Sequence, residues 1–346
     1  MKRIGIIGRF AFGENLLNGQ TIKTKSLTTA LSDIFGGDEL ICFDTYGGMK
    51  ALCRLPFQCI RAMSQCGNLI IMPAHKGIRV IAPLLMFMNL FYKRTLHYVV
   101  IGAWLCDLIK SKPVLKWCLK RFDYIYVETQ SMKRKLESMG FQNITLMPNF
   151  KELNILREEE LPRTEGQVCR LCTFSRVMKE KGIGIAVDAV RHVNAKLGKT
   201  VYTLDIYGQV DTKQMQWFEE LKSSFPPAVR YCGEIPYEQS VSVLKNYDLL
   251  LFPTQFYTEG IPGTIIDAFA AGLPVVASMW ENCGDIIDSE TGFLYPFEDT
   301  IGLERILLQQ AHDATPIGAM RKKCLHRAWQ YTPECVIRIL MDNLED

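Results

Sequence analysis

The sequence contains neither a hydrophobic run long enough to cross a bilayer nor an arrangement of cysteines typical of a metal site. The apolar segment VIAPLLMFMNLFY, residues 80–92, is well short of the roughly 20 residues that a transmembrane helix needs. The twelve cysteines are scattered. Only Cys169 and Cys172 are closely spaced, and they have no second pair to complete a zinc ribbon, so we expect core thiols. No secretory signal precedes the first expected strand, and reduced thiols then predict a cytoplasmic protein.

Acidic residues are absent from 51–106, although basic residues are not. The basic residues in this region are Arg54, Arg61, Lys76, Arg79, Lys93 and Arg94. Residues 1–150 hold 20 Lys and Arg against 9 Asp and Glu, whereas residues 151–346 hold 20 against 28. A solvated basic face is the simplest interpretation. One-sided charge beside apolar surface is also how peripheral proteins meet anionic lipid, here at the inner face of the plasma membrane.

Segment 80–92 lies within this acid-free region, between Arg79 and Lys93. We favour a buried core helix for it, with an interfacial helix as the alternative. No aromatic-interleaved basic motif or recognition helix accompanies the charge, so nucleic acid is not an expected partner.

Short apolar strands alternate with helical stretches in both halves of the chain, which indicates an α/β fold with two doubly wound parallel sheets. The expected strands are 3–8, 40–43, 68–72, 96–102, 124–128, 143–148, 169–175, 202–208, 229–235, 248–254, 273–278 and 292–296. We expect an N-terminal domain at 1–150, a polar linker at 151–167, a C-terminal domain at 168–328 and a final packing helix within 329–346. Two such domains bind ligands at the carboxyl ends of their strands, in a cleft between them.

The most informative segment is TEGIPGTIIDAFAAGLPVVAS, residues 258–278. It places Glu259 and Asp267 around a junction between a loop and a helix. Pro262 suits the first helical turn, and the free N–H groups of that turn attract an anion. Carboxylates on either side of an anion site predict a ligand with phosphate in its middle and hydroxyls at both ends, such as a nucleotide sugar. An ordinary turn with acids near a helix start is the alternative.

This segment resembles the E-x7-E signature of the retaining glycosyltransferases of family 4, with Asp267 in place of the second Glu. The resemblance implies the GT-B fold, in which two Rossmann-like domains face each other across a cleft. It also implies that Glu259 contacts the donor sugar and that Asp267 holds the ribose hydroxyls. The remaining donor contacts would come from the backbone of Gly260, Ile261, Pro262, Gly263 and Thr264.

A second motif, FSRVMKEKGIGIAVDAV at 174–190, resembles the segment in which this family grips the donor diphosphate with an Arg and a Lys. Arg176 and Lys181 hold those positions here. Two fixed cations stabilise a departing diphosphate without a metal, and no Asp-x-Asp pair occurs in the sequence. Arg176, Lys181 and Glu259 are therefore the candidate catalytic residues, and no metal ligand is predicted. Two solvated cations at helix ends are the alternative.

The N-terminal domain offers weaker matches. Gly19, in the segment Asn18-Gly19-Gln20-Thr21, takes the place of a glycine loop that faces the donor phosphate in relatives. His75 is the histidine nearest to a position that touches the donor sugar in relatives, but we assign no catalytic histidine. His97 lies within a strand and is expected in the core. In similar proteins the final helix crosses back onto the N-terminal domain.

Together with these residues, the resemblance implies a retaining, metal-independent hexosyltransferase of surface-polysaccharide or capsule biosynthesis. It would move a sugar from a UDP- or GDP-linked donor to a saccharide acceptor carried on polyprenyl diphosphate, with no cofactor beyond that co-substrate. A nucleotide-sugar epimerase and a non-catalytic binder of nucleotide sugars or polyanions are the alternatives. An epimerase needs no acceptor, and a binder leaves the donor intact.

Overall fold

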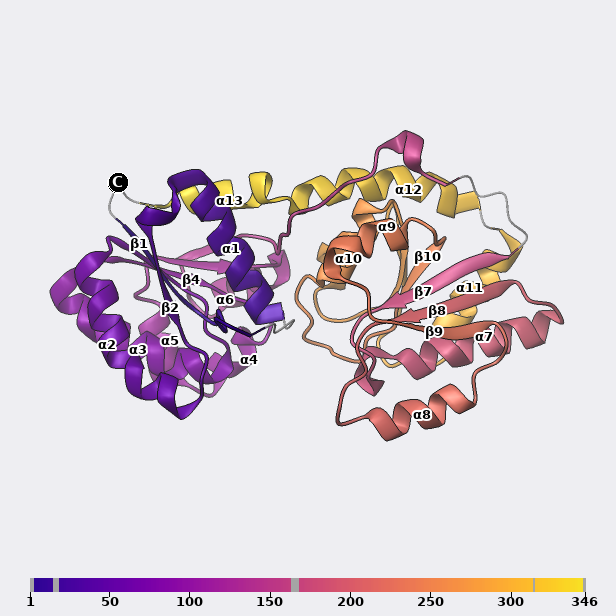
Figure 1. The fold of residues 1–346 in the computed structure, drawn as a ribbon, viewed down its shortest axis with the longest axis horizontal. Coiled ribbons are helices and arrows are strands. Elements are labelled where there is room, and N and C mark those ends of the chain that lie inside the picture. Colours follow the sequence, from indigo (N-terminus) through magenta and orange to yellow (C-terminus); the bar gives the residue numbers. More distant parts are fainter. Residues whose placement is uncertain (1–2, 15–18, 163–167, 314, 345–346) are drawn as a thin grey trace. The chain divides into compact units, whose positions relative to one another are not determined.

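The structure is a computed structural model that describes residues 3–14, 19–162, 168–313 and 315–344. It divides into two compact units, each built on one six-stranded parallel sheet (Figure 1). Unit 1 comprises Met1–Glu152 and Thr332–Asp346, and unit 2 comprises Leu153–Tyr331. The α/β architecture predicted from the sequence, with two doubly wound parallel sheets, is confirmed.

The division between the units differs in detail from the expected linker. Residues 153–162 belong to unit 2, because the N–H of Leu156 donates to the carbonyl of Ala270 at 3.0 Å and the Leu156 side chain joins the core of that unit. The rest of the predicted linker, 163–167, lies outside the described residues, as does Asn18. The chain re-enters unit 1 at Thr332, so the last helix packs there.

In unit 1 the strands run in the order β2-β1-β3-β4-β5-β6. Their bounds are β1 Ile4–Gly8, β2 Leu40–Asp44, β3 Asn68–Ile71, β4 Thr95–Val99, β5 Tyr124–Val127 and β6 Ile144–Leu146. The helices are α1 Gly19–Phe35, α2 Met49–Gln65, α3 His75–Tyr92, α4 Leu105–Lys110, α5 Pro113–Leu119, α6 Gln130–Ser138 and α13 Pro333–Met341. The strands β1, β3 and β4 are buried throughout, which is why they read as continuous apolar runs.

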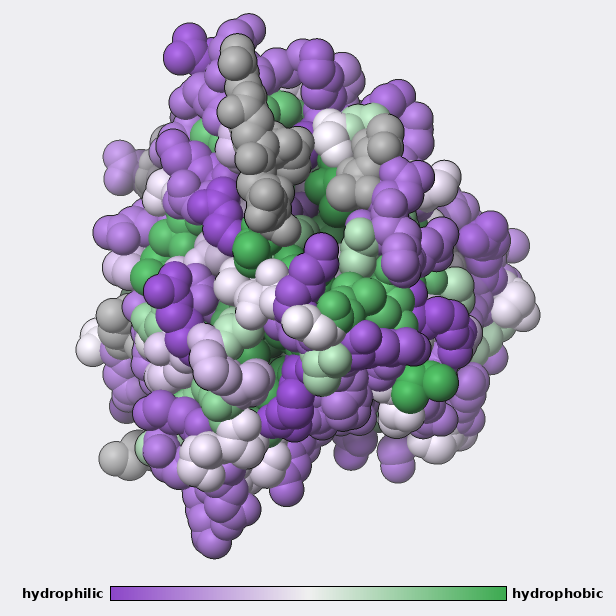
Figure 2. All heavy atoms as spheres, turned by 90° about the vertical axis from the view of Figure 1, so that its right-hand side faces the viewer, coloured by the Kyte–Doolittle hydropathy of each residue, from purple (hydrophilic) through white to green (hydrophobic). Residues whose placement is uncertain are grey.

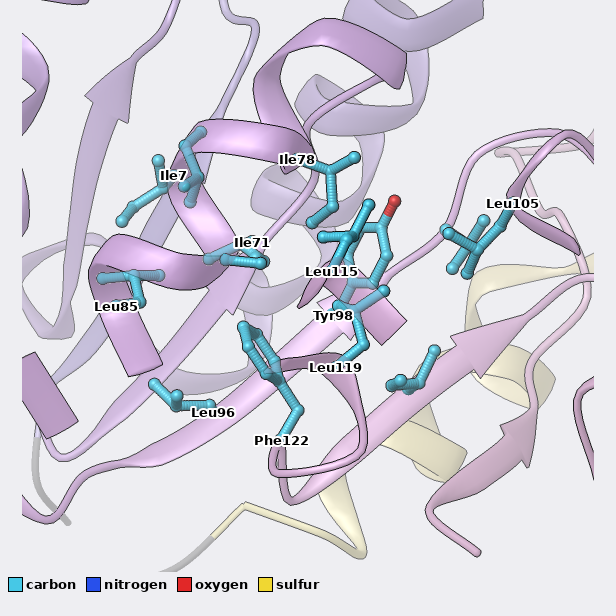
Figure 3. Packing of buried hydrophobic residues seen from close by; sticks show 14 of the residues in the cluster. Ile7, Ile71, Ile78, Leu85, Leu96, Tyr98, Leu105, Leu115, Leu119 and Phe122 are labelled. Carbon is cyan, nitrogen blue, oxygen red and sulfur yellow. The ribbon is translucent and has the colours of Figure 1, made fainter. Parts of the chain in front are cut away.

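Each face of this sheet has its own core. Helices α2, α3 and α5 pack over one face, where Ile71, Tyr98 and Leu115 meet (Figure 3). Helices α1 and α13 cover the other face, where Leu27 and Ile337 are buried (Figure 1).

His97 is a core residue, as predicted. Its ring nitrogens bond the Tyr126 hydroxyl at 3.1 Å and the Asn68 amide oxygen at 3.2 Å, and burial lowers its pKa to about 4.

In unit 2 the strand order is β12-β11-β10-β7-β8-β9. The strands are β7 Cys169–Phe174, β8 Tyr202–Tyr207, β9 Val229–Gly233, β10 Leu249–Phe252, β11 Val275–Ser278 and β12 Gly292–Tyr295. The helices are α7 Ile183–Leu197, α8 Met215–Ser223, α9 Ser240–Leu244, α10 Gly263–Ala270, α11 Gly302–His312 and α12 Thr315–Ala328. Cys172 is fully buried, whereas Cys169 at the strand start is only partly covered.

The surface of the molecule is mainly polar on the side that Figure 2 presents, with hydrophobic residues in small separate areas. Among the described residues, no helix has both the length and the apolar content needed to cross a membrane.

Candidate functional site

The sheet of unit 2 changes its direction of growth between β7 and β10. From β7 the sheet continues through β8 to β9 on one side, and from β10 through β11 to β12 on the other. Strands β7 and β10 lie side by side and parallel, with Leu171 opposite Leu249. Loops that leave such a strand pair diverge to opposite faces and open a crevice, the usual ligand site of an α/β sheet. The candidate site therefore lies at the carboxyl ends of these two strands.

Lys181 and Glu259 meet at this point although they lie far apart in sequence. The Lys181 ammonium donates a hydrogen bond to Glu259 Oε1. The same carboxylate oxygen accepts a bond from the Thr254 hydroxyl at 3.2 Å. The Lys181 and Glu259 side chains are only 18% and 17% exposed, and the rings of Phe256 and Phe252 lie 5.1 Å and 5.4 Å from the ammonium. Two of the candidate catalytic residues thus lie together in a partly dry setting, where charges interact more strongly than in water.

Gly182 makes this approach sterically feasible. Lys181 ends a short 3-10 turn, Lys179–Lys181, and Gly182 follows with a φ of 72° before α7 begins. A Cβ at Gly182 would lie 1.9 Å from the carbonyl oxygen of Pro253, just after β10. Glycine therefore allows both the left-handed backbone and the close contact between the two loops.

Polar contacts hold both loops in place. The N–H of Gln255 donates to the Glu180 carbonyl at 2.8 Å. Gln214 donates from its side chain to the Glu180 carboxylate at 2.8 Å and accepts from the N–H of Lys179 at 2.8 Å. The bond from Gln214 holds the pKa of Glu180 below its usual range. The motifs gave no sign of Gln214, because it comes from the loop after β8.

The loop that carries Glu259 is held from two further sides. The Ser278 hydroxyl donates to the Thr254 carbonyl at 2.6 Å, and the Asn282 amide donates to the Glu259 carbonyl at 3.0 Å. The sequence motifs assigned no role to Asn282. These bonds fix the backbone on both sides of the Glu259 carboxylate, so its orientation depends little on solvent.

Arg176 follows β7 as expected but does not join the pair in this structure. Its guanidinium lies 3.6 Å from a carboxylate oxygen of Asp211, and its side chain is 48% exposed. The loop is anchored by backbone bonds between Val177 and both Gln209 and Asp211. Arg176 thus keeps a partly exposed charge, paired with Asp211, beside the carboxyl end of β7.

The segment 260–264 leads into α10 at the same edge of the sheet. Pro262 is the residue before the helix, which begins at Gly263, so the expected position of Pro262 within the first turn is shifted by one. The Thr264 hydroxyl donates to the Phe174 carbonyl at 2.6 Å, which ties the start of α10 to the end of β7. A Cβ at Gly263 would meet no atom within 4 Å, so its backbone faces open space. The Ile261 side chain is buried.

Asp267 lies in the second turn of α10 and is only 5% exposed. Its predicted contact with ribose hydroxyls stays a prediction.

Unit 1 contains a pocket of its own at the carboxyl ends of β1, β2 and β3. Its volume is about 710 Å³, and charged and aromatic side chains such as Arg9, Tyr46, His75 and Lys76 line it. Sheet order again changes direction here, between β1 and β3. The ring of His75 lies with its centroid 4.0 Å from that of Trp104, and the two ring planes are tilted by 31°. Gly19 begins α1 next to the lining residue Gln20, with open space where a Cβ would be.

Comparison with known proteins finds a family match within unit 2. Residues 169–313 match the family model described as glycosyl transferases group 1. The expected resemblance of unit 2 to glycosyltransferases is thereby confirmed, and the matched segment contains Arg176, Lys181, Glu259 and Asp267. The assignment to family 4 stays a prediction.

Two curated relatives belong to bacterial polysaccharide biosynthesis. The amylovoran biosynthesis glycosyltransferase AmsK of Erwinia amylovora is 28% identical over 159 residues, which cover 44% of this chain and 39% of the relative. The putative colanic acid biosynthesis glycosyltransferase WcaL of Salmonella typhimurium is 23% identical over 146 residues, 41% of this chain and 36% of the relative. The match therefore spans about two fifths of the length of these relatives.

Solved structures share the fold along the whole chain. HepE (Alr3699) of Anabaena, in complex with UDP and glucose, aligns with a TM-score of 0.74 and 13% identity over 99% of both chains. Sucrose-phosphate synthase of Thermosynechococcus elongatus aligns with a TM-score of 0.76 and 15% identity, over 99% of this chain and 98% of that one. At these identities the likeness establishes the fold.

Proposed function

We propose that this protein is a retaining, metal-independent glycosyltransferase that transfers a hexose from a nucleotide diphosphate to a saccharide hydroxyl during surface-polysaccharide biosynthesis. The observation that carries the proposal is the Lys181–Glu259 pair at the switch point of unit 2, inside the segment that matches the glycosyltransferase family. The relatives that act in amylovoran and colanic acid biosynthesis support the polysaccharide role.

In this proposal the donor lies across the carboxyl ends of β7 and β10. Lys181 has three N–H donors and uses one on Glu259, so the other two remain for the diphosphate. Arg176, exposed at the same edge, supplies a second cation. The backbone N–H groups of Gly260, Gly263 and Thr264 add donors near the start of α10, and Glu259 meets hydroxyls of the sugar. Asp267 would hold the ribose.

The reaction follows from these contacts. The bond between C1 of the sugar and the diphosphate oxygen breaks as the acceptor oxygen attacks C1 from the same face, so the configuration at C1 is retained. The acceptor proton passes to the departing diphosphate. Lys181 and Arg176 stabilise the negative charge that grows on this leaving group, which removes the need for a metal or another cofactor.

We place the acceptor in the pocket of unit 1. Arg9 and Lys76 would neutralise an acidic group there, and the ring of His75, which lies against Trp104, offers an aromatic surface to a sugar ring. A saccharide linked to polyprenyl diphosphate has both features. Gly19 would permit close approach of the donor phosphate. The HepE complexes contain UDP, so UDP-sugars are the first donors to test, followed by GDP-sugars.

The test is a donor screen on the purified protein in EDTA, with and without a polyprenyl-diphosphate-linked saccharide. We expect nucleotide release coupled to transfer from one donor, retention at C1, and loss of activity in Glu259→Gln and Lys181→Ala. The matched control is Lys196→Ala, which removes an exposed lysine from α7. Interconversion of the donor sugar without nucleotide release would instead establish an epimerase. Binding without turnover would establish a pure binder, and loss of transfer in EDTA would refute metal independence.

A further inference from the structure

We propose that unit 1 docks onto an anionic lipid bilayer through one face, formed by helices α2, α3 and α5. We call it the basic apolar face and define it by the exposed residues Arg54, Phe57, Ile60, Arg61, Arg79, Val80, Phe87, Leu90, Phe91, Val114 and Trp117. This inference goes beyond the transferase chemistry and does not depend on it, because it concerns the outer surface of helices whose inner surface forms the core.

The three helices form one continuous layer. Helix α3 packs against α2 on one side and α5 on the other. All three place their inner side chains in the same core cluster, with Cys59, Leu85 and Leu115 as examples. Figure 1 shows them together on the face of the sheet opposite α1 and α13. Their outward-facing side chains therefore belong to a single surface.

Helix α3 shows why a core assignment alone is incomplete. Ile81, Ala82 and Leu85 are buried, but Phe87 and Phe91 are 59% and 74% exposed. The exposed positions 76, 80, 87 and 91 are separated by four or seven residues, so they lie on one side of the helix. The rings of Phe87 and Phe91 contact each other edge to face, with centroids 6.0 Å apart.

The neighbouring helices continue this apolar surface. On α2, Phe57 is 76% exposed and Ile60 lies three residues further along. On α5, Val114 and Trp117 are exposed, and the guanidinium of Arg121 lies 3.6 Å above the Trp117 ring. Water-exposed apolar side chains that gather on adjacent helices, rather than lying singly, mark an interaction surface.

Charge identifies the partner. Helices α2, α3 and α5 contain no acidic residue, whereas the exposed Arg54, Arg61 and Arg79 lie among the apolar side chains. Basic residues around exposed aromatic and aliphatic groups match a bilayer with anionic headgroups above hydrocarbon. A second copy of the same face would bring arginines against arginines with no carboxylate to pair them, because a two-fold contact joins identical patches. A nucleic acid would give Ile60, Val80 and Leu90 nothing apolar to enter.

Unit 2 provides the internal comparison. Its exposed large hydrophobic residues, such as Met215, Tyr237 and Ile301, come from separate elements. Unit 2 therefore offers variants matched in exposure that lie outside the proposed face.

The experiment is co-sedimentation of the protein with vesicles of phosphatidylcholine, either alone or with about 30 mol% phosphatidylglycerol, since anionic lipid attracts basic surfaces. We expect binding to the anionic vesicles only, with affinity that falls as salt rises from about 0.05 to 0.5 M because screening shortens the reach of charge. Phe87→Asp/Phe91→Asp and Arg54→Glu/Arg79→Glu should each lower the partition coefficient about tenfold or more.

The matched controls are Met215→Asp/Ile301→Asp and Lys196→Glu/Lys199→Glu in unit 2, all at exposed positions, and they should bind as the parent protein does. Unchanged circular dichroism will show that every variant is folded. Three results would overturn the proposal: no binding to anionic vesicles, equal binding to neutral ones, or an equal loss in the controls. A dimer in sedimentation velocity that Phe87→Asp/Phe91→Asp dissociates, without vesicle binding, would assign the face to self-association instead.

Discussion

Replacing Lys181 with methionine keeps most of the length of the side chain but removes its charge, and it leaves Glu259 in a setting where only 17% of its side chain is exposed. The Thr254 hydroxyl, at 3.2 Å, remains as a partner for the carboxylate. A hydrogen bond to a charged group contributes about 1.5–3 kcal/mol, and removal of one partner from a fully buried pair costs about 3–5 kcal/mol. Partial exposure lowers the penalty, so we expect Lys181→Met to reduce the free energy of unfolding by about 1–3 kcal/mol.

The contribution of the pair itself requires a double-mutant cycle. Glu259→Gln keeps an amide oxygen that accepts from Lys181, so it should cost about 1 kcal/mol. In Lys181→Met/Glu259→Gln neither charge remains, and the double variant should be more stable than the sum of the single effects predicts, by about 1–2 kcal/mol.

Urea unfolding followed by circular dichroism measures each free energy, with an unchanged m value as the sign that the same surface unfolds. Lys196→Met, at an exposed position on α7, should change stability by no more than about 0.5 kcal/mol. Additivity within about 0.5 kcal/mol would refute the reasoning, because residues that do not interact add in this way.

Three further predictions concern the supports of the two sheets. Gly182→Ala should destabilise unit 2 by more than about 1 kcal/mol, because the left-handed φ and a carbonyl oxygen 1.9 Å from the new Cβ both oppose the substitution. Gly184→Ala is the control: a Cβ there meets nothing within 4 Å, so thermal melts should show a neutral or stabilising effect. Burial lowers the pKa of His97 to about 4, so the stability that the neutral ring contributes is complete above about pH 6.5 and falls by about 3 kcal/mol as the pH approaches 4. His97→Gln should remove this dependence of the free energy of unfolding on pH, measured by urea titrations across that range. Burial alone would raise the pKa of Asp205, but hydrogen bonds, chiefly from Arg230 at 2.6 Å and 2.7 Å, outweigh burial and lower the pKa. The stability that the ionised Asp205 contributes is therefore present above about pH 4 and lost in stronger acid. Asp205→Asn should cost about 1–3 kcal/mol near neutral pH and less below about pH 3, as measured by urea unfolding.

The parts of the fold that follow from local sequence were predicted well. Both sheets are parallel and buried on two sides, so strands such as Asn68–Ile71 and Leu249–Phe252 appear as unbroken apolar runs. Lys181 and Glu259 could be assigned to one site because each follows a strand end, and parallel strands bring their carboxyl ends to one edge. Arg176 was assigned to the same site, but its guanidinium lies beside Asp211 instead.

Contacts made by packing between distant loops were beyond such reasoning. Gln214 bonds Glu180 from the loop after β8, and no residue pattern marks that loop as part of the site. Leu156 joins unit 2 through the Ala270 carbonyl, although its polar surroundings in sequence suggest a linker.

Segment 80–92 was ambiguous for a physical reason. Helix α3 is apolar on its buried side and also on part of its exposed side, so periodicity could not separate a core helix from an interfacial one.

The basic apolar face and the pocket of unit 1 meet at α3, which links the two proposals. The first turn of α3 lines the pocket with His75 and Lys76, and its last turns expose Phe87 and Phe91. Interfacial helices lie in the plane of the bilayer, so docking along α3 would bring the pocket near headgroup depth, within reach of a lipid-linked diphosphate. We therefore expect Phe87→Asp/Phe91→Asp to lower transfer to an acceptor embedded in anionic vesicles about tenfold, in line with its loss of partition. Transfer to a short-chain, water-soluble analogue of the same acceptor should be unchanged. An equal loss with both acceptors would show that the two phenylalanines act through the pocket or the fold, and the membrane would then have no part in presenting the substrate.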